Sequence, residues 1–429
     1  MHRVTKARLI KTVLAIGLTA AGAAGAAGCG GGGGDNDAAP TDPASVEGTV
    51  TFWTYPIGSS GEDGYWAPIV KQFQEKYPKV KVDIVVQPWT KREETLVTAI
   101  AGRQGPDVVY FNPDFIPKFA TERVLEEVAD VIADDKSDFA TSALESMSWN
   151  GKLYGVPLLM QVNLGVCHKD VLAAGGVDKC PESWSDVEAM APKVKAAGYV
   201  PTDYTAALPL TLNHSFYPYL WQAGGEVLSP DGTKAAFNSP EGLRALEFVK
   251  KLVDSGWTVP QSLTTSETLE QSPLGKGRQA FVNGASNILA LRKVIAPEKI
   301  VSAAPLTDKK RVAAGSVGGL SVLASSDAKA ASKAWIDFLT SPEQLRQFDQ
   351  KNGYYSPRKS VTGLFADDPV MALGEKYLDT VRTGVMHPKA RELMDVIKPH
   401  LQAALLGKVT PQAALAAAEK DANDLLKRN

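Results

Sequence analysis

Hydrophobic and polar residues alternate near the start of the globular part of the chain in a way that predicts short strands separated by helices. β-Branched and aromatic runs predict strands, and apolar residues at three- and four-residue spacing predict helices. The strands are expected at residues 47–53, 80–86 and 107–111, and the helices at residues 65–73 and 91–101. Short strands alternating with helices predict βαβ units and a parallel sheet, and therefore an α/β fold.

Helix starts recur in the second half of the sequence. A serine or threonine cap followed by proline or by acidic residues satisfies the free amides of a first helical turn. Such starts occur at Ser183, Ser239, Ser341 and Thr410, and the last opens an alanine-rich helix over residues 412–427. The α/β pattern is therefore expected to continue to the C-terminus.

The first 28 residues have the order of an export signal. Basic residues precede an apolar stretch from Thr12 to Gly28, and Cys29 follows a run of small residues. This arrangement resembles a bacterial lipobox, in which the cysteine thiol receives a diacylglycerol and becomes the new N-terminus. The alternative is an ordinary signal peptide with a chance cysteine. We expect residues 1–28 to be removed and residues 29–47, rich in Gly, Asp, Ala and Pro, to form a disordered tether.

The charge and length of the chain argue against a nucleic-acid-binding or membrane-spanning protein and favour a two-lobed one. Loss of residues 1–28 removes four basic side chains and no acidic ones, which takes the formal net charge from −2 to −6. A mildly acidic chain argues against nucleic acid as a partner and against a basic membrane-binding surface. No later segment has the ~20 apolar residues of a transmembrane helix. Roughly 400 remaining residues exceed one core, so two lobes are expected. The alanine- and glycine-rich signal is typical of a high-GC Gram-positive source.

Motifs of common enzyme chemistry are absent from the sequence. There is no His-Glu-x-x-His pair, no cysteine pair with zinc spacing and no Gly-x-Ser-x-Gly elbow. A loose Gly-x-Gly-x-x-Ala at residues 275–280 does not open a helix after a strand near a domain start. We therefore expect no metal, no cofactor and no catalytic residue. The sequence does not exclude a pair of carboxylates at the separation that a glycosidase needs.

Aromatic and amide residues gather instead at strand ends and helix starts. In open α/β sheets, ligands bind beyond the carboxyl ends of strands. Sugars suit such a site, because their C–H faces stack on aromatic rings and their hydroxyls pair with amides and carboxylates. The residues concerned are Trp53–Tyr55, Asn112, Asp114, Gln161, Asn163, His214, Tyr217, Trp221, Gly318, Gly319 and Tyr354. We expect Trp66, Trp184 and Trp335 to be core residues. For Tyr217 and Trp221, a core position and a ligand-binding position stay equally open.

Two cysteines remain after Cys29. Cys167 and Cys180 are 13 residues apart in a chain that is expected to be exported, where disulfides persist. We expect them to form a disulfide, and the alternative is two buried free thiols.

Five stretches together resemble the extracellular solute-binding proteins of ABC importers, specifically family 1, the maltose-binding-protein-like group. The resemblance runs from about residue 48 to the C-terminus, and the order and spacing of the stretches carry it. They are Phe52-Trp53 with the helix through Phe73, residues 105–109 (Gly-Pro-Asp-Val-Val), residues 151–157 (Gly-Lys-Leu-Tyr-Gly-Val-Pro), residues 221–225 (Trp-Gln-Ala-Gly-Gly), and residues 318–322 before 334–339.

This resemblance implies a periplasmic-binding-protein-like fold, with two α/β lobes joined by hinge crossings and a ligand cleft between them. The N-terminal lobe is expected over residues 48–157 and 300–350, and the C-terminal lobe over 158–299 and 351–429. The ligand-binding residues that it implies are Thr54, Tyr55, Asn112, Asp114, Gln161, His214, Tyr217, Trp221, Ser286, Asn287, Gly318, Gly319, Tyr354 and Arg358.

The sequence departs from the family pattern in two places. Cys167-His168 stands where the family has Tyr-Asn, and Cys180 precedes a changed Pro-x-Ser-Trp stretch, which strengthens the disulfide prediction. The Ser286-Asn287 loop also lacks a tryptophan that is often present, so the preferred sugar cannot be carried over.

The predicted function is that of a substrate-binding lipoprotein. It would bind a sugar or oligosaccharide by hinge closure and deliver it to the transmembrane subunits of an ABC permease. The expected location is the outer face of the cytoplasmic membrane, with a lipid anchor at Cys29, and the expected state is a monomer. Two alternatives stay open. One is a receptor for a non-sugar solute such as a glycerophosphodiester or peptide, with Arg358 and Arg391 as candidate cations. The other is a lipid-anchored carbohydrate-active enzyme.

Overall fold

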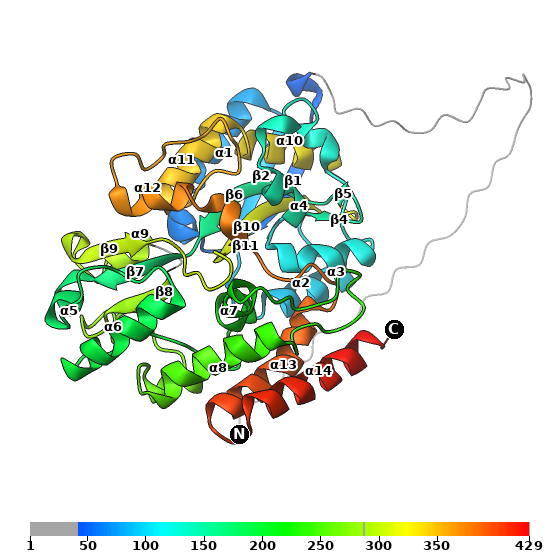
Figure 1. The fold of residues 1–429 in the computed structure, drawn as a ribbon. Helices are drawn as coiled ribbons and strands as arrows, with labels where there is room; N and C mark the ends of the chain where they lie inside the picture. The colour runs from blue at the N-terminus through cyan, green and yellow to red at the C-terminus, as the bar shows by residue number, and fades with distance from the viewer. Residues whose placement is uncertain (1–41, 286–287, 429) are drawn as a thin grey trace, which may run out of the picture. The chain divides into compact units, whose positions relative to one another are not determined.

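The computed structural model describes residues 42–285 and 288–428 (Figure 1). Cys29, the predicted signal peptide, most of the predicted tether, and Ser286 and Asn287 lie outside these residues. The described chain forms two hydrophobic cores and two main sheets. The first core lies against the larger sheet and also contains Leu164, Val166 and Ile300 of the second sheet, which faces the second core through Cys167 and Phe281. Across the described ranges, no helix combines the length and the apolar character needed to cross a membrane.

The first lobe is built on a mixed sheet in the order β11-β10-β3-β1-β2, with β6 also paired to β10. β1 runs parallel to β2 and β3, whereas β10 runs antiparallel to β3 and β6. The strands are β1 (Gly48–Thr54), β2 (Val80–Val86), β3 (Val108–Phe111), β6 (Val156–Val162), β10 (Ala313–Val322) and β11 (Val381–Arg382), with a small hairpin of β4 (Ser148–Trp149) and β5 (Lys152–Leu153). The helices are α1 (Ala67–Lys76), α2 (Arg92–Ala101), α3 (Ile116–Thr121), α4 (Thr141–Ser146), α10 (Lys329–Leu339), α11 (Pro342–Asn352) and α12 (Pro369–Glu375).

The second lobe is built on a three-stranded antiparallel sheet in the order β8-β7-β9. Its strands are β7 (Leu164–His168), β8 (Phe281–Ala285) and β9 (Ile300–Ala303). Its helices are α5 (Lys169–Ala174), α6 (Trp184–Ala196), α7 (Phe216–Gln222), α8 (Pro240–Asp254), α13 (Ala390–Leu405) and α14 (Pro411–Leu426). The remaining short helix, α9 (Ile288–Arg292), packs its buried face into the first core.

The predicted elements of the first lobe are confirmed because each carries its signal locally. Helix α2 ends at Gly102, as expected. Ser183 and Ser239 accept hydrogen bonds from backbone amides in the first turns of α6 and α8, and each such cap contributes about 1 kcal/mol. Trp66, Trp184 and Trp335 are buried core residues, as predicted.

The chain divides between the lobes differently from the expected boundaries. Strand β9 lies in the range assigned to the first lobe, yet it pairs with β7 in the second sheet. Residues from Tyr355 to Met371 were expected in the second lobe, yet their apolar side chains pack in the first core. The antiparallel second sheet also departs from the expected parallel arrangement. Local patterns indicate that a strand exists, whereas its partner depends on residues far away in the sequence.

Candidate ligand-binding site

Polar side chains collect where the parallel strands of the first sheet end. Asn112 follows β3 directly, and its amide makes two bonds with different elements. Its Nδ2 donates to Ser316 Oγ on β10 at 3.0 Å, and its Oδ1 accepts from Arg92 Nη1 on α2 at 2.6 Å. Asn112 therefore joins the carboxyl end of β3 to the strand that runs beside it.

The same face continues across the strands that lead between the lobes. Gln161 on β6 lies opposite Ser316 on β10, and directly opposed residues of antiparallel strands present their side chains on one face. Asn163 lies two residues further on, so it presents its side chain on that face too. Its amide nitrogen lies 3.0 Å from His214 Nδ1, at the start of α7. Asn163 Oδ1 is buried and has no partner among the described residues.

Strand β8 extends this face into the second lobe. Gly284 passes next to Asn163, since a Cβ added to Gly284 would lie in van der Waals contact with the Asn163 side chain, 3.5 Å from its Cβ. The backbone amide of the preceding residue, Asn283, donates to Asp203 Oδ1 at 3.2 Å. We call this continuous set the polar track: Arg92, Asn112, Ser316, Gln161, Asn163, His214, Asn283 and Asp203.

An aromatic surface lies beside the first-lobe end of the polar track. The rings of Tyr55 and Trp89 stack with centroids 4.7 Å apart, and Trp89 is 42 % exposed although it is a large apolar residue. The Arg92 guanidinium lies 5.1 Å from the Trp89 ring and 4.3 Å from the Phe115 ring. An exposed aromatic ring beside hydrogen-bonding amides is the combination that sugar recognition uses.

The titratable groups of the track are shaped mainly by burial. Protein atoms surround the Asp203 carboxyl, and this burial raises its pKa to about 6, although solvent still reaches part of the side chain. The His214 ring is also reached by solvent, but the protein atoms around it lower its pKa, and the nearby Asp114 carboxylate acts in the opposite direction. Side chains that water reaches but protein atoms surround are characteristic of a concave wall. His214 is therefore neutral at pH 7; its Nδ1 accepts from the Asn163 amide, so Nε2 carries the proton and can donate to a ligand.

The two arginines that the sequence offered for an anionic ligand, Arg358 and Arg391, are each paired with carboxylates, whereas Arg92 on the polar track donates to the neutral Asn112 amide. Arg391 forms ion pairs with Asp114 at 2.8 Å and with Glu93 at 3.1 Å. Arg358 is 3 % exposed, pairs with Asp135 at 2.6 Å and with Asp138 at 3.2 Å, and lies over the Phe139 ring. Neither guanidinium is left uncompensated for a phosphate, and the Asp114 carboxylate is held by Arg391.

The structure brings together five of the predicted site residues: Tyr55, Asn112, Asp114, Gln161 and His214. Several others have different surroundings. Thr54 is buried, and Tyr217 and Trp221 are each 1 % exposed within the second core. Tyr354 is half-buried and follows α11.

The glycine pair has a packing role in the structure. An added Cβ at Gly318 would lie 2.0 Å from Tyr110 Oη, and one at Gly319 would lie 2.4 Å from Met147 Cε. Only glycine lets these side chains pack against β10.

Sequence reasoning missed Trp89, Arg92, Ser316, Asn283 and Asp203. Trp89 and Arg92 follow β2, so the rule that was applied to the ends of the first and third strands would have found them. Ser316 could have been found from the alternation of β10, two residues before Gly318. Asp203 and Asn283 carry no local signal, because they meet only through tertiary contacts.

The chain is similar to a protein family and to several bacterial proteins. A family profile described as bacterial extracellular solute-binding protein matches residues 58–345, more than half of the chain. A binding protein of Brucella abortus is 24 % identical over 400 residues, which cover 91 % of this chain and 95 % of the relative. The diacetylchitobiose-binding protein DasA of Streptomyces coelicolor is 26 % identical over 247 residues, or 56 % of each chain.

Among solved structures, the GacH receptor of Streptomyces glaucescens has the same fold. That receptor is described unliganded and in complex with acarbose. It superposes with a TM-score of 0.77 at 23 % identity, and covers 89 % of this chain and 99 % of its own.

Proposed function

The chain belongs to the bacterial extracellular solute-binding protein family, and we propose that it binds a sugar or oligosaccharide between its lobes for an ABC importer. The observation that carries the proposal is the polar track with its aromatic end. Amides, a hydroxyl and a neutral imidazole supply both donors and acceptors, and Trp89 over Tyr55 offers an apolar ring face. A neutral ligand with many hydroxyls matches this chemistry better than an anion does, because Arg391 and Arg358 are already paired with carboxylates. Arg92 is held by the Asn112 amide and by the Trp89 and Phe115 rings.

The proposed cycle is hinge closure. A ligand that contacts both lobes favours the closed state through its differential affinity for that state. The closed protein would then dock on the transmembrane subunits of the permease, and the protein itself would catalyse no reaction. We propose that it acts as a monomer.

The proposed location rests on the first 29 residues. Removal of residues 1–28 and lipidation of Cys29 would hold the protein at the outer face of the cytoplasmic membrane. The anchor would raise its effective concentration at the permease. A Gram-positive source fits this arrangement.

A thermal-shift screen tests the ligand class. Mono- and oligosaccharides, including maltotriose and N,N′-diacetylchitobiose, are compared with glycerophosphodiesters. A sugar that binds should raise the melting temperature, since a ligand at a hundredfold excess over its dissociation constant stabilises by about 2.7 kcal/mol. Stabilisation by a glycerophosphodiester and by no sugar would overturn the proposal.

A further inference from the structure

We propose that Asp203 is the anion through which the second lobe holds the hydroxyl groups of the ligand, and that the ligand is held while Asp203 is ionised and released when it is protonated. This inference rests on the proposed sugar-binding function. It adds a residue to the site and a dependence on pH that the family assignment does not contain.

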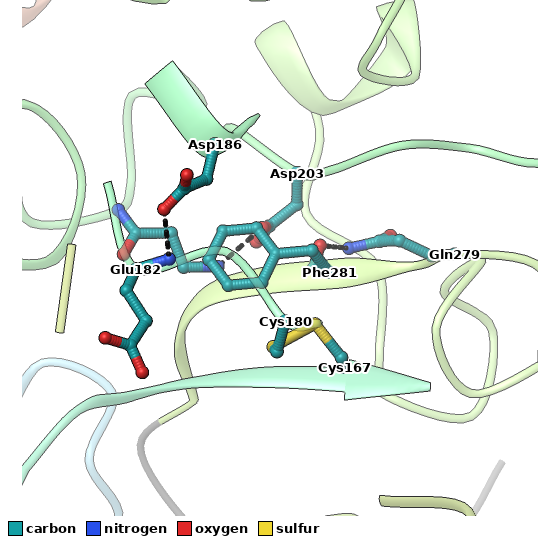
Figure 2. The surroundings of a disulfide bond; sticks show 8 residues. Cys167, Cys180, Glu182, Asp186, Asp203, Gln279 and Phe281 are labelled. Carbon is teal, nitrogen blue, oxygen red and sulfur yellow. Dashed lines mark hydrogen bonds between the residues drawn. A yellow bond between two sulfur atoms is a disulfide. The ribbon is translucent and has the colours of Figure 1, made fainter. Parts of the chain in front are cut away.

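The position of Asp203 is fixed by β8 and α7. The Asn283 amide donates to Asp203 Oδ1 at 3.2 Å, and the Asn283 side chain hydrogen-bonds to the Tyr219 phenol on α7. Figure 2 draws Asp203 among the residues around the Cys167–Cys180 disulfide, together with Phe281 of β8. Asp203 is thus held at the second-lobe end of the polar track by a stapled sheet.

The carboxylate has capacity left for a ligand. Among the described residues, Asp203 forms no ion pair, and its second oxygen accepts no hydrogen bond from another residue. Its side chain is only half-buried, so solvent or a ligand can reach it. A carboxylate oxygen that accepts from a hydroxyl makes a charge-assisted bond, which is roughly twice as strong as a neutral one.

Among the described residues, no basic group is paired with Asp203. The titratable group that interacts with it is the Tyr219 phenol on α7, and Tyr204 follows it in the same loop. Figure 2 also draws two acidic residues around the disulfide, Glu182 and Asp186, and neither supplies a positive charge. Burial raises the pKa of both phenols to values above the physiological range, so neither is charged. Burial also raises the pKa of Asp203 to about 6. The carboxylate is therefore ionised at pH 7.5 and mostly protonated at pH 5.

His214 is the other group on the track that can change charge near this range. Its ring is bonded to Asn163, and burial lowers its pKa, so it gains a proton at a lower pH than a free histidine does. An experiment must therefore separate Asp203 from His214.

The test is calorimetry of the whole mature protein with maltotriose and with N,N′-diacetylchitobiose at pH 7.5 and pH 5.0. If only the ionised form binds, a pKa near 6 makes the affinity about tenfold weaker at pH 5.0 than at pH 7.5. Asp203→Asn keeps an oxygen for the Asn283 amide but cannot ionise. It should bind more weakly than wild type at pH 7.5 and show little change between the two pH values.

The matched control is Asp254→Asn, which removes a carboxylate at the exposed end of α8 and should keep the wild-type pH profile. Melting curves at both pH values establish that each variant is folded. A wild-type affinity that is equal at the two pH values overturns the inference. So does a tenfold change that survives in Asp203→Asn, because His214 would then carry it. Binding of neither probe by wild type at pH 7.5 overturns the inference and also counts against the proposed function for these sugars.

Discussion

At the scale of single residues, Asp349 is a carboxyl group that is buried in an unfavourable environment. It lies on α11 with 0 % exposure, and neither carboxylate oxygen has a partner among the described residues. Burial raises the pKa of this carboxyl well above its usual range. Above the pKa of the unfolded chain, near 4, the folded state must keep a proton or bury a charge, so stability falls as pH rises.

We predict that Asp349→Asn stabilises the protein at pH 7.5. An unpartnered buried polar group costs about 1–3 kcal/mol, and a charge costs more, whereas the neutral amide has the same shape. The gain should shrink as pH falls toward 4, because the unfolded wild type then begins to take up the proton that the folded state already holds. Urea unfolding at pH 7.5 and pH 4.5 measures it, and an equal gain at both pH values would contradict this explanation.

Trp221 shows how the same residue type can serve two purposes that sequence alone does not separate. Its position in an aromatic stretch before a Gly-Gly pair favours a ligand contact and a core contact equally. In the structure it is 1 % exposed, packs beside Tyr217 and has Arg382 4.3 Å from its ring centroid.

Trp221→Ala should therefore destabilise the fold. Truncation of a buried tryptophan costs about 3–5 kcal/mol, because it removes buried apolar area and leaves a cavity. Thermal or urea unfolding checks the expected loss, with Trp89→Ala as the exposed counterpart that should change stability little. An unfolding free energy that stays at the wild-type value would contradict the core role of Trp221 and would favour a ligand contact instead.

At the scale of elements, the first lobe was predictable and the second was less so. A local run of β-branched or aromatic residues predicts each of the strands β1, β2 and β3. The helices between these strands predict that they pair in parallel, as they do. The β8-β7-β9 sheet joins segments more than a hundred residues apart, and no local pattern specifies that pairing. Asp203 and Asn283 could not be predicted either, because they meet only through contacts between distant segments. Tyr55 and Asn112 could be predicted, because each lies at the end of a strand.

The disulfide staples an element boundary of the second lobe. The structure joins Cys167, in the central strand β7, to Cys180, which precedes α6. Cross-linking a loop of this size lowers the entropy of the unfolded chain, which stabilises the folded protein by about 3 kcal/mol in the chain-entropy model.

Replacing both cysteines by serine should lower the unfolding free energy by about that amount. The oxidised wild type and the double variant are compared by urea unfolding, and reduced wild type is the matched control, which should resemble the variant. Equal stability of the oxidised and reduced wild-type protein would remove the stapling role.

At the scale of the whole molecule, the N-terminal cysteine is predicted to decide where the receptor works. In a Gram-positive cell, Cys29→Ser should prevent lipidation, so every molecule from which the signal peptide is removed should appear in the medium, because a tether without lipid has no hold on the membrane. Immunoblots of cell and medium fractions measure the distribution. A variant of mature size that stays fully cell-associated would contradict anchoring through Cys29, whatever the protein binds.

The central claim is that the two lobes hold a sugar along the polar track. The most direct measurement is isothermal titration calorimetry of the mature protein with the sugar that gives the largest thermal shift, repeated with Trp89→Ala. We expect one ligand per chain, and an affinity several-fold to about tenfold weaker in the variant, as loss of one stacking contact implies. Saturable binding that is unchanged in Trp89→Ala would contradict the proposed site, and no binding of any sugar would contradict the function.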